Sequence, residues 1–172
     1  GRGTFVAEHT QEKALFHFFR LVSLDGRRQL PESELLQVDK LHANEHEREA
    51  LGLASEDTVI RIVRLRKLDD QPVIYEILTV PLALFPTLAE QGSLPNSLYS
   101  LYQTDYGLSV VKAVERVKAV AAKTEEVKNL KVKKGTPLLE IERIAYALDG
   151  RAIELRVSRC DTENYRYMVE LT

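Results

Sequence analysis

Two hairpin patterns limit what this chain can fold into more than any other feature of its sequence. In each pattern, two apolar, β-branched runs flank a short polar turn, Asp69-Asp70-Gln71 in the first and Asp149-Gly150 in the second. Runs of this length around such turns indicate pairs of antiparallel strands. In both hairpins the turn follows Leu-Asp and a carboxylate lies on the return strand, which suggests a weak internal duplication. The four strands are expected at 58–68, 72–81, 137–148 and 151–160.

Further strands and short helices are expected along the rest of the chain. Asn44 followed by Glu47 is a capping-box pattern for a helix start, and Asn96 or Ser97 can begin a second helix that Gly107 ends. Mostly antiparallel strands with a few short helices define an α+β domain. The other strands are expected at 14–24, 33–43, 108–122 and 164–171, and the helices at 45–53, in part of 82–92, at 96–107 and, capped by Thr124, at 125–130.

Composition argues against several kinds of protein. The chain has 172 residues, the size of one ordinary domain, and a net charge of −2 from 24 Lys and Arg against 26 Asp and Glu. Nucleic-acid-binding domains usually carry a basic excess, so charge alone argues against such a surface. Cys160 is the only cysteine, which rules out an internal disulfide and fits a reducing cytoplasm. No apolar run reaches the length of a membrane span, and the N-terminus, which does not begin with Met, suggests a fragment rather than a signal peptide.

Charged residues interrupt the apolar pattern of the first hairpin. Arg64 and Arg66 lie two positions apart and so share one face of their strand, while Glu76 lies on the return strand. A two-residue turn would point Glu76 away from the arginines, whereas a three-residue turn would place Arg64 opposite Glu76. The sequence does not choose between these registers. The same three-residue turn in the second hairpin would place Glu154 opposite Tyr146.

Two arginines and one or two glutamates on one face would suit an anionic or zwitterionic ligand. Guanidinium groups bind carboxylates and phosphates in a forked geometry, and glutamates accept hydrogen bonds from hydroxyl or amino groups. Taken without other information, an ordinary cross-strand Arg–Glu pair on a solvated sheet face is the simpler account.

The order and spacing of several segments resemble the UTRA effector-binding domain of HutC-type regulators in the GntR family. The opening residues "GRGTFV" (1–6) resemble the wing that closes a GntR-type winged helix-turn-helix domain. The resemblance places the end of that wing and a linker at 1–10 and the UTRA domain at 11–172. The segments that carry the UTRA resemblance are 49–81, 97–110, 132–154 and 165–171.

This resemblance implies a chorismate-lyase-like fold, in which a curved antiparallel sheet is flanked by short helices, and a pocket for a small anionic metabolite. In family members that bind phosphorylated sugars, strand arginines, two glutamates and a Ser-x-Tyr at a helix start hold the ligand. It also implies a homodimer, which meets operator DNA only through an N-terminal domain absent here. A cytoplasmic location is expected, and no cofactor or metal. The matching positions in this chain are Arg64, Arg66, Glu76, Ser97, Tyr99 and Glu154.

Two departures from the family pattern bear on the ligand. Residues 18–33 lack the Ser/Thr-rich stretch that would supply a phosphate hydroxyl, and Cys160 stands where an aromatic residue is expected. Both weaken the case for a phosphosugar. A carboxylate ligand, held against the Phe-rich N-terminal segment, is at least an equal alternative.

Effector sensing rather than catalysis is the expected function, with two alternatives. A chorismate-lyase-like enzyme would share the fold and could use arginine and glutamate, and a dimerisation module would need no ligand. His42 and His46 are four residues apart, but the helix is expected to begin between them, so no metal site is expected. Cys160 has no evident histidine partner and is not expected to act as a nucleophile.

Overall fold

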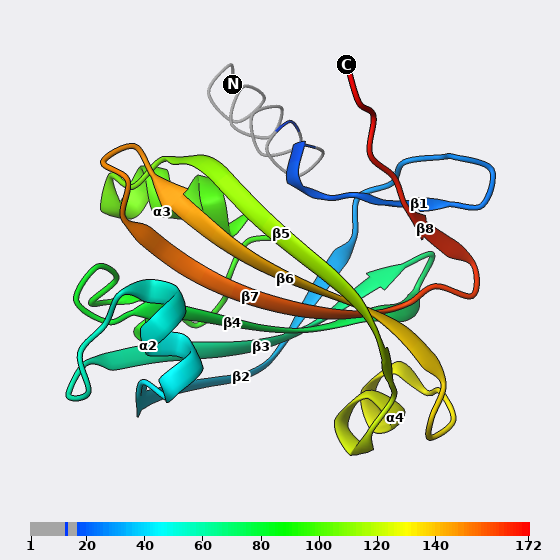
Figure 1. The fold of residues 1–172 in the computed structure, drawn as a ribbon, viewed down its shortest axis with the longest axis horizontal. Coiled ribbons are helices and arrows are strands. Elements are labelled where there is room, and N and C mark those ends of the chain that lie inside the picture. The colour runs from blue at the N-terminus through cyan, green and yellow to red at the C-terminus, as the bar shows by residue number, and fades with distance from the viewer. Residues whose placement is uncertain (1–12, 14–16) are drawn as a thin grey trace.

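A long, twisted antiparallel sheet forms the centre of the domain (Figure 1). The structure is a computed structural model that describes residue 13 and residues 17–172, so the predicted wing remnant and linker at 1–10 lie outside the described part. Six strands follow the order β2-β3-β4-β7-β6-β5, which confirms the α+β class and the antiparallel sheet with short helices. They are β2 (Glu32–His42), β3 (Thr58–Leu68), β4 (Gln71–Pro81), β5 (Val110–Ala121), β6 (Pro137–Ala147) and β7 (Ala152–Asp161).

A second, two-stranded sheet brings together the two ends of the described chain. β1 (Leu21–Ser23) pairs with β8 (Tyr165–Tyr167), close to the C-terminus in Figure 1. The longer strands expected at 14–24 and 164–171 are therefore wrong over most of their described residues.

Packing of aromatic side chains explains why residues 17–20 are not part of the strand expected at 14–24, which is reduced to Leu21–Ser23. His17 and Phe18 are helical, and the ring of Phe18 meets that of Tyr99 edge-on at 4.8 Å. Phe18 and Phe19 both line a cavity between this segment, helix α3 (Leu98–Tyr106) and the sheet. This segment is therefore held by its side chains and not by a strand ladder.

Within residues 19–172, three α-helices cover the two faces of the sheet. In Figure 1, α2 lies in front of the strands and α3 behind them. The capping box of Asn44 and Glu47 is present, and Gly52 and Gly107 end α2 and α3 with φ of 65° and 66°, where glycine is favoured. The helices are α2 (Glu45–Leu51), α3 (Leu98–Tyr106) and α4 (Thr124–Leu130).

The helical part expected within 82–92 is a short 3-10 turn, η1 (Leu88–Glu90), which begins after Pro86. One helix prediction needs correction. The N-cap of α4 is Lys123 rather than Thr124, and no side chain caps this helix. No helix among the described residues is long and apolar enough to span a membrane.

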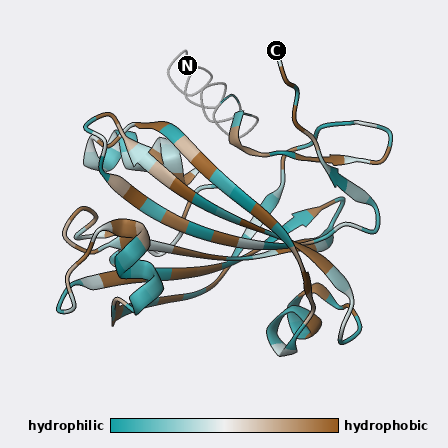
Figure 2. Ribbon diagram, viewed as in Figure 1, coloured by the Kyte–Doolittle hydropathy of each residue, from teal (hydrophilic) through white to brown (hydrophobic). Residues whose placement is uncertain are grey.

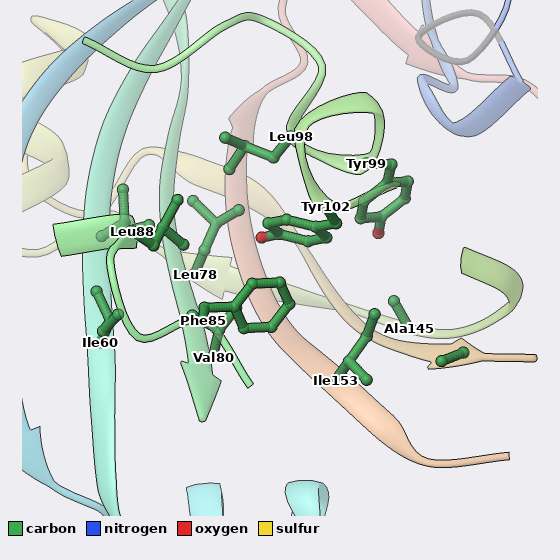
Figure 3. Packing of buried hydrophobic residues seen from close by; sticks show 12 residues of the cluster. Ile60, Leu78, Val80, Phe85, Leu88, Leu98, Tyr99, Tyr102, Ala145 and Ile153 are labelled. Carbon is green, nitrogen blue, oxygen red and sulfur yellow. The ribbon is translucent and has the colours of Figure 1, made fainter. Parts of the chain in front are cut away.

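The main core lies between α3 and the sheet. Tyr99 and Tyr102 project from α3 toward the strands, and Phe85 packs against Tyr102 with ring centroids 4.6 Å apart (Figure 3). Apolar and polar residues alternate along most strands, as the banding in Figure 2 shows. One face of the sheet therefore packs on α3, while α2 and α4 cover the other.

The first hairpin combines the two registers that the sequence left open. Leu68 pairs with Gln71, so the turn has two residues, and both have positive φ, 50° at Asp69 and 60° at Asp70. Arg64 nevertheless lies opposite Glu76, because the register shifts beyond Arg66. The extra residue there is a β-bulge, which turns the following side chains over to the other face.

The second hairpin differs from its prediction by one residue. The amide of Ala147 donates to the carbonyl of Arg151, which closes a loop over 148–150. A register shift then places Glu154 opposite Ala145, not opposite Tyr146. Bulges in both hairpins thus set which face their glutamates occupy.

Candidate functional site

A cavity lies where the start of α3 and residues 18–21 meet the sheet. It opens on the face of the sheet that packs on α3, which we call the inner face. Its empty space, counting the part open to solvent, is about 630 Å³. Its apolar walls include Phe18, Phe19, Leu21, Ile74, Leu98 and Ile141. Its polar side chains include Arg66, Glu76, Ser97, Arg143, Arg156 and Ser158.

Arg64 lies outside the cavity and holds residues of the site in place. Its Nε and Nη2 donate to Glu76 Oε1 at 2.8 and 2.5 Å, and its Nη1 donates to the carbonyls of Pro95 and Asn96 at 3.4 Å. Only 1% of Arg64 is exposed, and it does not line the cavity. It therefore ties the loop before α3 to the sheet and leaves ligand contact to its neighbour.

Arg66 lines the cavity, and two of its donors have no partner among the described residues. Its Nη1 approaches Glu76 Oε1 at 3.5 Å, but Nε and Nη2 make no hydrogen bond to any described residue, and the residue is only 2% exposed. Its guanidinium stands 5.6 Å from the ring centre of Phe19. Burial lowers the pKa of Arg66 to about 9, with Glu76 opposing the shift and Arg64 adding to it. Arg66 is thus charged at neutral pH and incompletely paired.

Glu76 is the single carboxylate between these two guanidiniums. Burial alone would raise its pKa, but Arg64, Arg66 and Arg156 outweigh burial and hold the pKa far below the usual range. Ser158 donates to Glu76 Oε2 at 3.3 Å. One negative charge therefore faces two positive charges, which leaves a buried positive excess at Arg66.

Glu154 is the centre of a second network. Its Oε1 accepts from Tyr99 at 3.2 Å and from Arg156 Nε at 2.8 Å, and its Oε2 accepts from Tyr102 at 2.6 Å and from Arg156 Nη2 at 3.1 Å. The residue is fully buried and does not line the cavity. Burial lowers the pKa of Arg156, but Glu154 and Tyr99 outweigh it and raise that pKa well above normal. The two oxygens of this carboxylate therefore already accept four hydrogen bonds from other side chains.

Ser97 and Tyr99 lie at the start of α3, beside the cavity. Ser97 is the N-cap, and its hydroxyl accepts the amide of Ser100 at 3.4 Å. The guanidinium of Arg156 lies 5.1 Å from the ring centre of Tyr99. Both predicted residues therefore border the cavity while also fixing α3 in place.

Arg143 on β6 is a cavity residue that sequence reasoning missed. Its Nε donates to Glu115 at 2.7 Å, its Nη2 donates to the carbonyl of Phe18, and Tyr167 donates to the other oxygen of Glu115. Arg143 pairs across the sheet with Arg156. The alternation of β6 and β7 could have revealed this pair, but only with the correct hairpin register.

The structure divides the six predicted site residues into two groups. Four line the cavity: Arg66, Glu76, Ser97 and Tyr99. Arg64 and Glu154 lie behind it and hold other residues in place. Sequence reasoning missed Arg143, Arg156 and Ser158, which share the inner face, and it placed the Phe-rich segment near the ligand only in general terms.

The described histidines and Cys160 form neither a metal site nor an activated nucleophile. His46 is hydrogen-bonded to Glu142 at 2.8 Å, and no group of three His, Cys, Asp or Glu residues there could hold a metal ion. Cys160 lines the cavity, but burial and, secondarily, Glu76 raise the pKa of its thiol. The thiol therefore stays protonated, which is unfavourable for a nucleophile.

Comparison with known proteins places the chain in a family. Residues 26–166 match the sequence profile of the UTRA domain. The chain is 28% identical to the HTH-type transcriptional repressor NagR of Bacillus subtilis over 98% of this chain and 69% of that protein, and 26% identical to the mannosyl-D-glycerate transport/metabolism system repressor MngR of Escherichia coli over 97% and 70%. Among solved structures, the ligand-binding domain of a GntR-family regulator from Bordetella bronchiseptica is similar, with a TM-score of 0.81 and 31% identity over 90% of this chain and 98% of that one. The chain therefore belongs to the UTRA domain family, the effector-binding domains of GntR-family transcriptional regulators.

Proposed function

We propose that this domain senses a small anionic metabolite, a carboxylate or a phosphosugar, and that the bound metabolite changes how an attached N-terminal domain binds operator DNA. The observation that carries the proposal is Arg66, whose buried Nε and Nη2 have no partner among the described residues. An unsatisfied buried donor costs about 1–3 kcal/mol, and more when it is charged. An anion in the cavity would remove that cost, so the site favours its ligand strongly over an empty state.

Coupling to DNA binding would pass through residues 18–21. These residues form one wall of the cavity and lie at the N-terminal end of the continuously described chain. Arg143, which also lines the cavity, donates to the carbonyl of Phe18. A ligand that attracts Arg143 or packs on Phe18 would bias the position of this segment, and linkage would shift DNA affinity by the same free energy.

The wider proposal is a cytoplasmic homodimeric regulator and not an enzyme. Its relatives are named as transcriptional repressors, which supports regulation. The net charge of −2 supports operator contact through a separate domain. One relative is named for mannosyl-D-glycerate, a sugar joined to a carboxylate, so that compound belongs among the ligands to test.

Thermal unfolding with and without anions tests the proposal. Phosphate, glucose 6-phosphate, mannosyl-D-glycerate and aromatic carboxylates would each be added to wild type, Arg66→Gln and a control, Arg151→Gln. Arg151 has the same charge but sits in an exposed turn, paired with Asp149. A ligand at 100 times its Kd stabilises the folded state by about 2.7 kcal/mol, or roughly 5–10 °C for a domain of this size.

We expect at least one anion to raise the unfolding temperature of wild type and of Arg151→Gln but not of Arg66→Gln. The proposal fails if no anion stabilises wild type, or if Arg66→Gln responds like the control.

A further inference from the structure

We infer that the ligand is a monocarboxylic acid with an aromatic or aliphatic body and not a phosphorylated sugar. This inference rests on the proposed function and narrows it to one chemical class. Three properties of the cavity carry it: its net charge, its hydrogen-bond acceptors and its walls.

The buried charges around the cavity leave room for one negative charge. Four arginines face three glutamates, and each glutamate has a partner at hydrogen-bonding distance. Glu76 is shared by Arg64 and Arg66, while the other two pairs are each neutral. Arg20 also borders the cavity and is partly buried, as Glu115 is, so it adds a second positive charge that is less buried than that of Arg66. The uncompensated buried charge is that of Arg66, and one carboxylate with two oxygens would match its free Nε and Nη2. A phosphate monoester carries about −1.5 to −2 at pH 7, which is more negative charge than Arg66 alone compensates.

The carboxylates near the cavity offer few acceptors for sugar hydroxyls. Glu154 accepts four hydrogen bonds inside the protein and is fully buried. Glu115 is occupied by Arg143 and Tyr167. Only Glu76 Oε2, with one long bond from Ser158, has capacity left toward the cavity. Asn96, Ser97 and Ser158 also line the cavity and could accept from a hydroxyl group, so the shortage concerns the carboxylate acceptors that a sugar with several hydroxyl groups would use.

The walls of the cavity favour an apolar body instead. Phe18 and Phe19 come from the N-terminal segment, Leu98 from α3, and Ile74 and Ile141 from the floor of the sheet. The fully buried Cys160 adds a protonated thiol, which behaves as a small apolar group. Phe19 lies beside Arg66, so a planar acid bound to this guanidinium would meet the Phe19 ring directly. The Phe19 ring and the guanidinium of Arg66, two of whose nitrogens have no described partner, therefore lie next to each other.

Isothermal titration calorimetry with four probes separates the possibilities. The probes are 3-phenylpropionate, its uncharged analogue 3-phenylpropan-1-ol, glucose 6-phosphate and inorganic phosphate. We expect 3-phenylpropionate to bind at least tenfold tighter than each of the other three. Tighter binding of glucose 6-phosphate would overturn the inference and leave the proposed function standing. Equal binding of the alcohol would also overturn the inference. Absence of binding by all three anions would contradict both this inference and the proposed function.

A variant of one wall residue supplies an independent readout. Phe19→Ser should weaken 3-phenylpropionate about tenfold and leave the affinity for inorganic phosphate unchanged. Leu24→Ser, at an exposed position outside the cavity, is the control and should change neither affinity. Equal loss for both probes in Phe19→Ser would show that the residue only maintains the fold, and the inference would then be wrong.

Discussion

Replacing Arg66 by methionine should make the ligand-free protein more stable while it abolishes anion binding. Arg66 is 2% exposed, and two of its nitrogens have no partner among the described residues. Each unsatisfied donor costs about 1–3 kcal/mol. Its pKa of about 9, against 12.5 for a free guanidinium, corresponds to roughly 5 kcal/mol that disfavours the charged form in the folded state. Methionine has a similar length and no polar hydrogen, so the replacement removes this cost.

Some favourable interactions would also be lost. The contact with Phe19 contributes about 0.5–2 kcal/mol, and the Arg66–Glu76 pair at 3.5 Å is long. Glu76 keeps its shorter bonds to Arg64 in the variant. The expected net gain is about 1–3 kcal/mol, or roughly 2–10 °C in the unfolding temperature.

Arg64→Met is the matched control and should behave in the opposite way. Every nitrogen of Arg64 has a partner, two bonds going to Glu76 and others to the carbonyls of Pro95 and Asn96. Removal of one partner of a buried ion pair costs about 3–5 kcal/mol. Urea unfolding in phosphate-free buffer gives both changes from the midpoint and slope. A loss of stability in Arg66→Met at unchanged slope, or a gain in Arg64→Met, would refute this reasoning.

Three further predictions follow from the same contacts. Tyr102→Phe should lose about 1–3 kcal/mol in urea unfolding, because the hydroxyl donates to the buried Glu154. Tyr106→Phe should change by less than about 0.5 kcal/mol, because its hydroxyl bonds, to Thr87 and Gln91, are exposed or only partly buried. Equal losses would count against the Glu154 network. Asp70→Gly should gain about 0.5–1 kcal/mol, since Asp70 has a φ of 60° that glycine adopts without strain, and a loss would contradict the two-residue turn. Affinity for 3-phenylpropionate should be constant from pH 6 to 8 and decline above about pH 9, because only protonated Arg66 attracts the anion. Constant affinity up to pH 10.5 would show that burial does not lower the pKa of Arg66.

Local patterns accounted for the elements of this fold, with limits that have physical causes. The alternation in β3, β4, β6 and β7 and the capping box at Asn44 depend on neighbours in sequence, so they could be predicted. The strand expected at 14–24 is reduced to Leu21–Ser23, because Phe18 and Phe19 line a cavity built from distant residues. Aromatic composition favours a strand, but tertiary packing overrode that tendency.

The roles of the charged residues could be predicted only in part. The resemblance identified Arg64 and Arg66 together, but their roles differ: one is saturated with partners and the other has free donors. Glu154 was expected at the ligand and is instead buried behind Tyr99. Such differences depend on which groups surround each side chain in three dimensions, and no spacing along the chain records them.

The sequence by itself determined the antiparallel hairpins, the family and the presence of charges inside an apolar strand. Tertiary structure decided where those charges point. The turn after Leu68 has two residues, which alone would send Glu76 to the outer face, but a bulge before Ile74 returns it to the inner face opposite Arg64. Val73, the extra residue, is 3% exposed and packs in the core with Leu68, so burial of an apolar side chain sets the register. That packing energy comes from residues far apart in sequence, which is why only the folded chain brings Glu76 and the arginines together.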